Sequence, residues 1–319
     1  MAIVAIIDTG YKSYEYEQEL FGGMGYELKI FQGERADVPA KRALARKAEG
    51  ILVRDTPLGE ETFSRAPELK AIVRYGTGYD NVDVEAATNH AIKVANVQGY
   101  GNHSVSDHAL ALMFGCIRGI PTGEKNILSD FGKPPFQEVF ELHDKTLGII
   151  GLGRIGGTFC DKARPLFSRV LASDPYIPDK TFEHHGADKS DLENLLKESH
   201  VISLHCNLTP ETRQLINREA FRLMGQRPVL INTSRGPVID ADALLEAANG
   251  NLIHSAGIDV YENEPAGERQ EALVQHPRII TTGHYAWYSN RSMVVMQKKA
   301  ADNLAAMLKG EMIEDCLNP

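Results

Sequence analysis

Five charged or acid–base side chains follow the last three apolar strands that the sequence predicts. Arg235 comes directly after "PVLINTS", Asp259 lies in "HSAGIDV" with Glu262 and Glu264 just beyond it, and His284 ends "RIITTGH". In an open α/β sheet, ligands bind outside the carboxyl ends of the strands. We therefore expect these side chains to converge on one rim of a sheet.

This set of side chains suits the transfer of a hydride to or from a carboxylate-bearing substrate with an oxygen on C2. His284 can exchange the proton of a C2 hydroxyl near neutral pH. A carboxylate should orient its imidazole and stabilise the protonated form, and we choose Glu264 for that role. Arg235 offers a planar fork that can bind the substrate carboxylate and polarise the C2 oxygen.

A glycine-rich turn after an apolar strand predicts the nucleotide that would carry the hydride. The stretch "TLGIIGLGRIGGTFC" contains Gly151, Gly153 and Gly156, spaced G-x-G-x-x-G, and runs on into a helix. Such glycines permit a tight turn, close approach of a pyrophosphate and close helix packing. The next strand ends at Asp174, where a carboxylate can bind ribose hydroxyls and repel a 2′-phosphate. The pattern favours NAD over NADP, although Asp174 could instead be a turn residue before Pro175.

The elements that must position these residues form two α/β series, which suits a chain of 319 residues. Roughly the first hundred residues alternate β-branched apolar runs with helical patterns, as in a parallel sheet covered on both faces. A largely apolar helix is expected at 103–120. A polar stretch with little regular pattern follows at 121–145 and could be an arm or a partner-facing segment. A second series then runs to His284, and we expect the amphipathic helix at 292–311 to return to the first domain.

Two helices of the second series carry capping signals. Ser190, with Glu193 three residues later, forms a capping-box pattern, so we predict Ser190 as an N-cap. A later helix is expected to begin at Asp240 and to end at Gly250, because glycine commonly follows a helix C-terminus.

Composition narrows the class of protein further. The net charge is -9 and the pI is near 5.7, which argues against nucleic acid or an anionic membrane as a partner. No apolar run is long enough to span a bilayer. The cysteines at positions 116, 160, 206 and 316 are scattered, so neither a metal site nor a disulfide is predicted. We expect a cytoplasmic protein.

Six segments together resemble the D-isomer-specific 2-hydroxyacid dehydrogenases. They occur in the family's order over nearly the whole chain: "RYGTGYDNVDVEAA", "GLGRIG", "SLHCNLTPETRQLIN", "INTSRGPVIDADAL", "GIDVYENEP" and "GHYAWYS". The resemblance implies an α/β protein of two doubly wound parallel-sheet domains. These are a Rossmann-type NAD-binding domain at 101–287 and a smaller flavodoxin-like substrate-binding domain at 1–100 plus 288–319. It also implies NAD as cofactor, a small 2-hydroxy or 2-keto acid as substrate, and a homodimer.

The resemblance also assigns roles to single residues. The family's catalytic Arg, Glu and His fall on Arg235, Glu264 and His284, which ranks Glu262 second to Glu264, and Asp259 would hold the nicotinamide carboxamide. Backbone N–H groups of the loop matching "YGTG" would bind the substrate carboxylate, because glycine lets the backbone come close, and a simple turn is the alternative. The expected NAD-binding residues are Gly151, Gly153, Arg154, Ile155, Gly156, Asp174, His205, Cys206, Thr233, Ser234, Arg235, Asp259 and His284. The expected substrate-binding residues are Tyr75, Gly76, Thr77, Gly78, Arg235 and His284.

Several residues depart from the family pattern or have no assigned role. Gly283 stands where the family often has proline before its catalytic histidine, so we expect a looser loop there, and Asn207 also replaces a common proline. Trp287 is suggested as a wall that limits substrate size, against the plainer alternative of a packed residue. His103 and His108 flank the helix between the domains, where His103 could line a cleft or pack at a hinge.

Two alternatives stay open. Arg54 and Arg74, at the ends of first-domain strands, could bind a second anion on the substrate or simply pair with Asp55 or another acid. "HYAWYSN" and "VRYGTGYDNVD" also look similar to the C-terminal-binding-protein corepressors. The alternative to an NAD-dependent D-2-hydroxyacid dehydrogenase, or 2-ketoacid reductase, is thus an NAD(H)-sensing interaction protein on the same fold. Phosphoglycerate, glyoxylate/hydroxypyruvate and a generic D-2-hydroxy acid are the candidate substrates.

Overall fold

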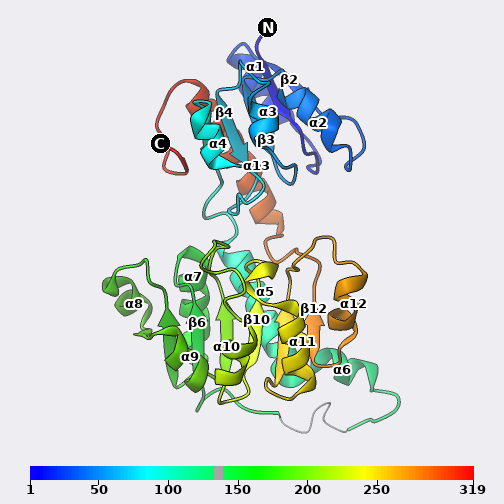
Figure 1. Ribbon diagram of the computed structural model, residues 1–319, viewed down its shortest axis with the longest axis vertical. Helices are drawn as coiled ribbons and strands as arrows, with labels where there is room; N and C mark the ends of the chain where they lie inside the picture. The colour runs from blue at the N-terminus through cyan, green and yellow to red at the C-terminus, as the bar shows by residue number, and fades with distance from the viewer. Residues whose placement is uncertain (133–138) are drawn as a thin grey trace. The chain divides into compact units, whose positions relative to one another are not determined.

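Two parallel sheets organise the chain, each within its own unit (Figure 1). The computed structural model describes residues 1–132 and 139–319. Unit 1 comprises Met1–Gly101 and Ser289–Pro319, and unit 2 comprises Asn102–Tyr288. Part of the expected arm at 121–145 lies outside the described residues. Within the described ranges, no helix is long and apolar enough to cross a membrane.

Unit 1 is built on a five-stranded parallel sheet with the strand order β2-β1-β3-β4-β5. This is the flavodoxin-like order. The strands β1, β3 and β4 are almost entirely buried, which explains why they are continuous apolar runs. The strands are β1 (Ile3–Ile6), β2 (Glu27–Ile30), β3 (Gly50–Val53), β4 (Ala71–Arg74) and β5 (Lys93–Ala95). The helices are α1 (Glu15–Gly23), α2 (Val38–Ala45), α3 (Glu60–Phe63), α4 (Val84–Asn89) and α13 (Asn290–Leu308).

The last helix, α13, belongs to the same unit as the N-terminus. It packs on β3 and β4, and Leu304 and Leu308 lie close against Gly50, the first residue of β3. Beyond the helix, Cys316 forms an antiparallel bridge with Ala95 alongside the edge strand β5. Both a helix and an extended segment from the end of the chain therefore complete the first sheet.

Unit 2 is built on a seven-stranded parallel sheet with the order β12-β11-β10-β9-β6-β7-β8. The order β8-β7-β6-β9-β10-β11 is that of the Rossmann fold, with the switch point between β6 and β9. The predicted pair of doubly wound α/β domains is confirmed. The strands are β6 (Thr146–Ile150), β7 (Arg169–Ser173), β8 (Asp188–Lys189), β9 (Val201–Leu204), β10 (Val229–Asn232), β11 (Ser255–Ile258) and β12 (Ile279–Thr281). The helices are α5 (Asn102–Arg118), α6 (Ile120–Lys125), α7 (Arg154–Ala163), α8 (Asp179–His185), α9 (Leu192–Glu198), α10 (Arg218–Leu223), α11 (Ala241–Asn249) and α12 (Glu268–Gln275), with the 3₁₀-helices η1 (Arg164–Leu166) and η2 (Gly236–Val238).

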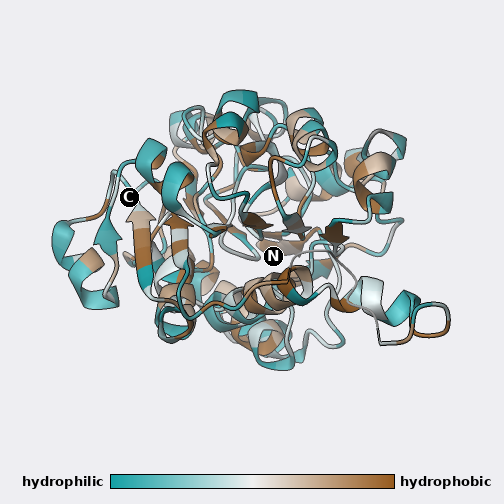
Figure 2. Ribbon diagram, turned by 90° about the horizontal axis from the view of Figure 1, so that it is seen from below, coloured by the Kyte–Doolittle hydropathy of each residue, from teal (hydrophilic) through white to brown (hydrophobic). Residues whose placement is uncertain are grey.

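The helix α5 packs closely on the centre of this sheet, against β10 and β11. A Cβ atom on Gly257 of β11 would lie 2.9 Å from the Cβ of Leu112 and 3.3 Å from the Sγ of Cys116. The small residue thus lets α5 approach the strand. Hydrophobic residues are concentrated in the strands and on the inward sides of the helices, and the outward sides are hydrophilic (Figure 2).

One expectation about a helix is wrong. The N-cap of α9 is Asp191 rather than Ser190, since the Asp191 carboxylate accepts a hydrogen bond from Asn194 N at 2.7 Å. A carboxylate is favoured over a hydroxyl there because it also complements the positive end of the helix dipole. The polar stretch after α5 begins with the short helix α6, which has Pro121 in its first turn. The predicted N-cap Asp240 of α11 is confirmed.

Candidate active site

The carboxyl ends of β9, β10, β11 and β12 meet at one edge of the unit 2 sheet, because the four strands are parallel neighbours. His205 follows β9, Arg235 follows β10, Glu264 lies beyond β11, and His284 follows β12. The structure therefore brings these four side chains to the same edge, although they are spread over about 80 residues of sequence.

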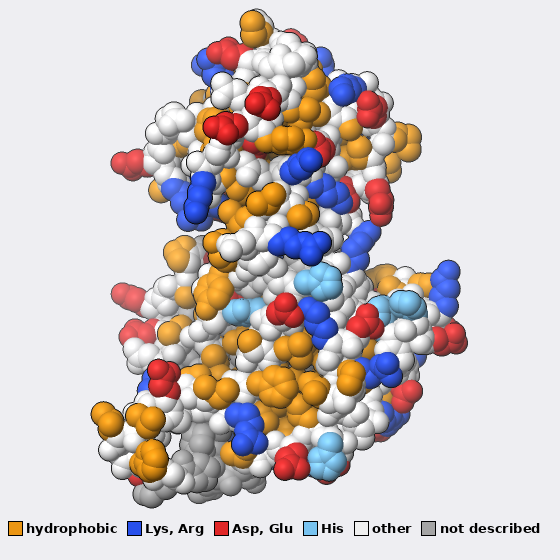
Figure 3. Space-filling model, turned by 180° about the vertical axis from the view of Figure 1, so that it is seen from behind, with side chains coloured by type: hydrophobic (Ala, Val, Ile, Leu, Met, Phe, Trp, Pro, Cys, Tyr) orange, Lys and Arg blue, Asp and Glu red, His pale blue; other side chains and the backbone are white. Residues whose placement is uncertain are grey.

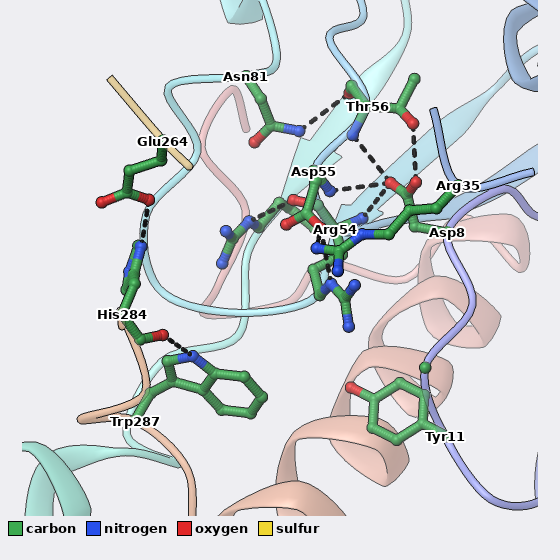
Figure 4. Close-up of polar contacts among 12 residues, drawn as sticks. Asp8, Tyr11, Arg35, Arg54, Asp55, Thr56, Asn81, Glu264, His284 and Trp287 are labelled. Atoms are coloured by element: carbon green, nitrogen blue, oxygen red, sulfur yellow. Dashed lines mark hydrogen bonds and ion pairs between the residues drawn. The ribbon is translucent and has the colours of Figure 1, made fainter. Parts of the chain in front are cut away.

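Glu264 and His284 are in direct contact (Figure 4). The Oε2 atom of Glu264 lies 2.5 Å from Nδ1 of His284, and its Oε1 atom accepts from Tyr261 N at 3.0 Å. Burial by itself raises the pKa of Glu264, but the hydrogen bond and charge of His284, the Tyr261 N–H and the charge of Arg235 together lower it below the ordinary value. Glu264 is thus ionised at neutral pH. It can fix the imidazole and stabilise its protonated form, while Nε2 of His284 has no partner among the described residues.

The loop that carries Arg235 is held by Asn232, which sequence reasoning missed. Asn232 is 1% exposed at the end of β10. Its Oδ1 accepts from the N and Oγ of Ser234 at 3.0 and 2.8 Å, and its Nδ2 donates to Arg235 O at 2.9 Å. A polar residue that ends a buried apolar strand needs such partners, and that was the signal available in the sequence. Ser234, expected at the cofactor, therefore uses its hydroxyl within the protein.

Gly236 joins the Arg235 loop to the Glu264 loop. A Cβ atom at Gly236 would lie 1.9 Å from the carbonyl carbon of Tyr261 and 2.1 Å from its oxygen. The two loops therefore pack backbone against backbone, and only glycine fits between them. This contact sets the position of Arg235 relative to Glu264.

Asp259 fixes the loop that carries His284. It is fully buried, and its Oδ1 accepts from Thr282 Oγ1 at 2.6 Å and from Tyr285 N at 3.1 Å. Its Oδ2 accepts from Ala286 N at 2.9 Å, and its carbonyl oxygen accepts from His284 N at 2.8 Å. These bonds hold His284 at a φ of 54°, which is uncommon for a residue with a side chain. Both carboxylate oxygens are thus used by the protein, and contact of Asp259 with nicotinamide stays a prediction.

The glycine that replaces the family's proline does not leave this loop without support. Besides the Asp259 contacts, Tyr261 Oη donates to Thr282 O at 2.8 Å, and Trp287 Nε1 donates to His284 O at 3.0 Å (Figure 4). Gly283 lies between these anchored positions. The indole of Trp287 therefore supports the His284 loop, and its suggested role in limiting substrate size stays a prediction.

The turn between β6 and α7 has the form of a dinucleotide site. Gly151 has a φ of 88°, and a Cβ atom there would lie 2.7 Å from Cys206 N. A Cβ atom at Gly156 would lie 2.0 Å from the carbonyl oxygen of Gly151. Gly153, by contrast, would meet nothing within 4 Å, and no side chain caps the start of α7. An open glycine at an uncapped helix N-terminus can receive a pyrophosphate. These residues fit NAD, and Arg154 and Ile155 form the first turn of α7 beside it.

His205 and Cys206 lie under the same turn. Burial lowers the pKa of His205 to about 3, so its ring is neutral. Its Nε2 lies 2.9 Å from Ser203 Oγ, and its buried Nδ1 has no hydrogen-bond partner in the described ranges. Burial also raises the pKa of the Cys206 thiol to about 11. Thr233, at the next strand end, likewise has a buried hydroxyl without a partner among the residues described.

Asp174 caps the glycine turn from the end of β7. Its Oδ2 accepts from Leu152 N at 2.9 Å, and its Oδ1 accepts from Tyr176 N at 3.0 Å. The carboxylate is therefore fixed beside the glycines, where ribose hydroxyls of a bound dinucleotide are expected.

We expect Asp174→Ala and Asp174→Asn to raise the ratio of kcat/KM with NADPH to kcat/KM with NADH by at least about tenfold, the equivalent of ~1.4 kcal/mol. The reason is that both substitutions remove a negative charge that would repel a 2′-phosphate. The asparagine variant keeps an oxygen for Leu152 N and so separates charge from the loss of the cap. Steady-state rates with each coenzyme measure the ratio, and an unchanged ratio in both variants would mean that Asp174 does not contact the ribose.

Unit 1 holds a separate loop with free backbone donors, Gly76–Gly78, one residue beyond the end of β4. Val97 N and Asn96 Nδ2 donate to carbonyl oxygens of this loop at 3.0 and 2.6 Å. The N–H groups of its three residues find no partner in the part of the chain that the structure describes, so they can receive an anion. The side chain of Tyr75 is buried, so only the backbone of Tyr75 could contact a substrate.

Arg54 and Arg74 lie at the same carboxyl edge of the unit 1 sheet. Arg54 Nε donates to Asp55 Oδ2 at 3.0 Å, so the simple pairing is present. Arg74 Nε donates to Arg54 O at 3.1 Å. A Cβ at Gly76 would lie 1.9 Å from Arg74 Nη1. The guanidinium of Arg74 thus lies directly against the loop with the free N–H groups.

A buried carboxylate holds the backbone from which Arg54 projects (Figure 4). Asp8 pairs with Lys41 at 2.6 Å and accepts from the backbone N atoms of residues 54–56 at 2.8 to 2.9 Å. Burial alone raises the pKa of Asp8, but these hydrogen bonds lower it to about 2. The loop 54–56 is therefore rigidly placed, which suits a recognition role for its side chains.

Comparison with known proteins places this geometry in context. A family model described as "D-isomer specific 2-hydroxyacid dehydrogenase, NAD binding domain" matches residues 110–286. The chain is 31% identical over 301 residues to a glyoxylate reductase of Korarchaeum cryptofilum, covering 92% of this chain and 90% of that protein. It is 34% identical over 276 residues to a D-3-phosphoglycerate dehydrogenase of Methanocaldococcus jannaschii, covering 86% of this chain but only 52% of that longer protein.

Solved structures agree with the sequence relatives. The structure of a D-lactate dehydrogenase from Aquifex aeolicus, complexed with NAD and lactic acid, superimposes with a TM-score of 0.89 at 27% identity over 99% of both chains. A glyoxylate reductase from Paecilomyes thermophila gives a TM-score of 0.88 at 27% identity, over 99% of this chain and 98% of that one.

Proposed function

This chain belongs to the D-isomer-specific 2-hydroxyacid dehydrogenase family and uses NAD, and on that premise we propose that His284 is the acid and base of its reaction. The proposed reaction interconverts a D-2-hydroxy acid and its 2-keto acid. The 2.5 Å contact between Glu264 and His284, at the sheet edge that also presents Arg235, carries the proposal.

The chain's own residues would move the proton and stabilise charge. When bound, NADH supplies the hydride that C2 of the keto acid receives. As the C2 oxygen gains negative charge, Nε2 of a protonated His284 donates its proton to it, and Arg235 stabilises the charge. Glu264 stabilises the imidazolium before the transfer. In the reverse direction a neutral His284 accepts the hydroxyl proton.

We propose further that the substrate carries a second acidic group, bound by Arg54 and Arg74. Both guanidinium groups lie against glycine backbone, since a Cβ at Gly10 would lie 2.5 Å from Arg54 Nη1 and a Cβ at Gly76 would lie 1.9 Å from Arg74 Nη1. A planar guanidinium binds a carboxylate or phosphate through paired hydrogen bonds. The relative named D-3-phosphoglycerate dehydrogenase supports an acid of this kind.

A homodimer is part of the proposal. Hydrophobic side chains gather on the face of unit 2 that Figure 3 presents. In and after α6, Ile120, Ile127, Leu128 and Phe131 are 57 to 98% exposed. An apolar surface of this kind is typical of a contact with another protein chain.

A panel of 2-keto acids with and without a phosphate tests the function. We expect NADH oxidation with glyoxylate, hydroxypyruvate and 3-phosphohydroxypyruvate. Arg54→Ala should lower kcat/KM for the phosphorylated acid about 10- to 100-fold more than for glyoxylate, which is the effect of one charged hydrogen bond. Arg35→Ala is the matched control, because Arg35 pairs with the same Asp55 but is 80% exposed, and it should leave both rates unchanged.

Three outcomes separate the alternatives. Turnover with the expected Arg54 effect supports both proposals. Turnover with an equal effect of Arg54→Ala on both substrates would overturn only the proposal that Arg54 and Arg74 bind a second acidic group. Tight NADH binding with no turnover on any keto acid would favour an NAD(H)-sensing interaction protein.

A further inference from the structure

His108 of α5 is a part-buried histidine that the proposed reaction does not use. Its Nε2 lies 2.9 Å from Oγ1 of Thr282 and 3.7 Å from Oδ1 of Asp259. Its ring also meets the ring of Tyr285 edge to face, with 5.2 Å between centroids. His108 therefore contacts the loop residues on both sides of His284 as well as the carboxylate that anchors them.

The direction of each hydrogen bond follows from the chemistry of Asp259. An ionised carboxylate can only accept, so Thr282 Oγ1 gives its single proton to Asp259 Oδ1. The Thr282 oxygen is then an acceptor towards His108, and His108 must carry its proton on Nε2. Burial lowers the pKa of His108, against the opposing charge of Asp259, which favours a neutral ring whose one proton is on Nε2. The chain of donors runs from His108 through Thr282 to Asp259.

The hydrogen bonds that both carboxylate oxygens of Asp259 accept depend on the orientation of the Thr282 hydroxyl. The Oδ1 atom shares its acceptor capacity between the Thr282 hydroxyl and Tyr285 N, and the Oδ2 atom holds Ala286 N. If the hydroxyl of Thr282 lost the donor that faces it, it could rotate away from Oδ1. The carboxylate would then be held by one hydrogen bond fewer, and the backbone on both sides of His284 would have a less firmly fixed acceptor.

We propose that His108 is a positioning residue for His284, acting through Thr282 and Asp259 on the loop 282–286. The inference rests on the proposed role of His284 as acid and base. A displacement of a catalytic group by about 1 Å can lower the rate on the order of 100-fold. The hydrogen bond from His108 to Thr282 can therefore affect turnover even though neither residue contacts the imidazole of His284. It acts on the placement of His284 and not on the glycine turn at β6, so it should lower kcat far more than it weakens NADH binding.

His108→Leu, His108→Gln and Thr282→Val test the proposal. Leucine removes the N–H donor, glutamine keeps one at a similar reach, and valine removes the hydroxyl while keeping the shape of threonine. We expect His108→Leu and Thr282→Val each to lower kcat roughly tenfold, the effect of one hydrogen bond, with the Kd for NADH within about twofold of the original. His108→Gln should restore most of kcat.

The double variant His108→Leu with Thr282→Val gives the sharpest result. Because both changes break one chain of hydrogen bonds, the double variant should be no slower than the slower single variant. Losses that multiply, no rescue by glutamine, or an unchanged kcat in Thr282→Val would overturn the proposal. If His108→Leu does not fold, the kcat values of Thr282→Val and His108→Gln still decide the question. A roughly tenfold loss in Thr282→Val with little loss in His108→Gln supports the proposal, and an unchanged kcat in Thr282→Val overturns it.

Failure here is distinct from failure of the proposed function. If His284→Ala abolishes turnover while His108→Leu and Thr282→Val do not change kcat, only the positioning role is lost. If His284→Ala keeps its kcat, the assignment of His284 itself fails.

Discussion

We expect His284→Ala to lower kcat by roughly 10²- to 10⁴-fold, the usual contribution of a general acid or base, and to weaken NADH binding far less. The physical reason is that the alanine removes the imidazole that Glu264 orients at 2.5 Å but leaves the glycine turn of β6 and α7 untouched. The C2 oxygen would then have to exchange its proton with water. This is the largest effect that we expect of any single substitution.

Steady-state NADH oxidation gives kcat, and the quenching of protein fluorescence by NADH gives the Kd. Glu264→Gln is the companion variant, because it keeps an oxygen for Tyr261 N and removes the charge that stabilises the imidazolium. It should lose less of kcat than His284→Ala. An equal loss of kcat and NADH affinity in His284→Ala would remove the acid–base assignment.

The second largest effect is expected from Gly236→Ala. Its Cβ would lie 1.9 Å from the carbonyl carbon of Tyr261, and neither backbone can give way without moving Arg235 or Glu264. A displacement of about 1 Å at such a site costs on the order of 100-fold in rate. We expect kcat/KM to fall by about that factor, although Gly236 does not itself touch the substrate.

Gly267→Ala is the matched control for Gly236→Ala. Gly267 lies just beyond Glu264, and a Cβ there would meet nothing within 4 Å, so we expect kcat/KM within about twofold and a stability change of less than ~1 kcal/mol. Thermal unfolding of both variants separates a loss of fold from a shift of the loops. A Gly236→Ala enzyme with unchanged kcat/KM would show that the Arg235 loop does not need its contact with Tyr261.

The parts of the site that could be predicted rest on local patterns and one rule of topology. Alternating strands and helices predict a parallel sheet, and the rule for strand ends then brings Arg235, Glu264 and His284 to one edge. The glycine spacing at 151–156 is equally local, because all three glycines belong to one strand-to-helix turn, although Gly151 also lies against the backbone of Cys206. The confirmed N-cap at Asp240 depends only on the residues that follow it.

The parts that could not be predicted depend on contacts between distant segments. His108 and Thr282 are 174 residues apart in sequence, and nothing local to either of them indicates the other. The family resemblance implies a nicotinamide contact for Asp259, which stays a prediction, and nothing local to Asp259 indicates that its buried oxygens also hold the His284 loop. Ser190 and Asp191 are adjacent and both have side chains suited to an N-cap. The negative charge of Asp191, which complements the helix dipole, favours it over Ser190.

The return of α13 to unit 1 has a consequence for the order in which the protein can be made. The strands β3 and β4 leave the ribosome about 200 residues before the helix that covers them. At ~5–20 residues per second the interval is roughly 10–40 s. Throughout that time the part of the nascent sheet that α13 covers, over β3 and β4, lacks its helix, while the whole of unit 2 can already fold. The second unit is thus the first that can be finished, and unit 1 is the one most exposed to aggregation and to the need for a chaperone during synthesis.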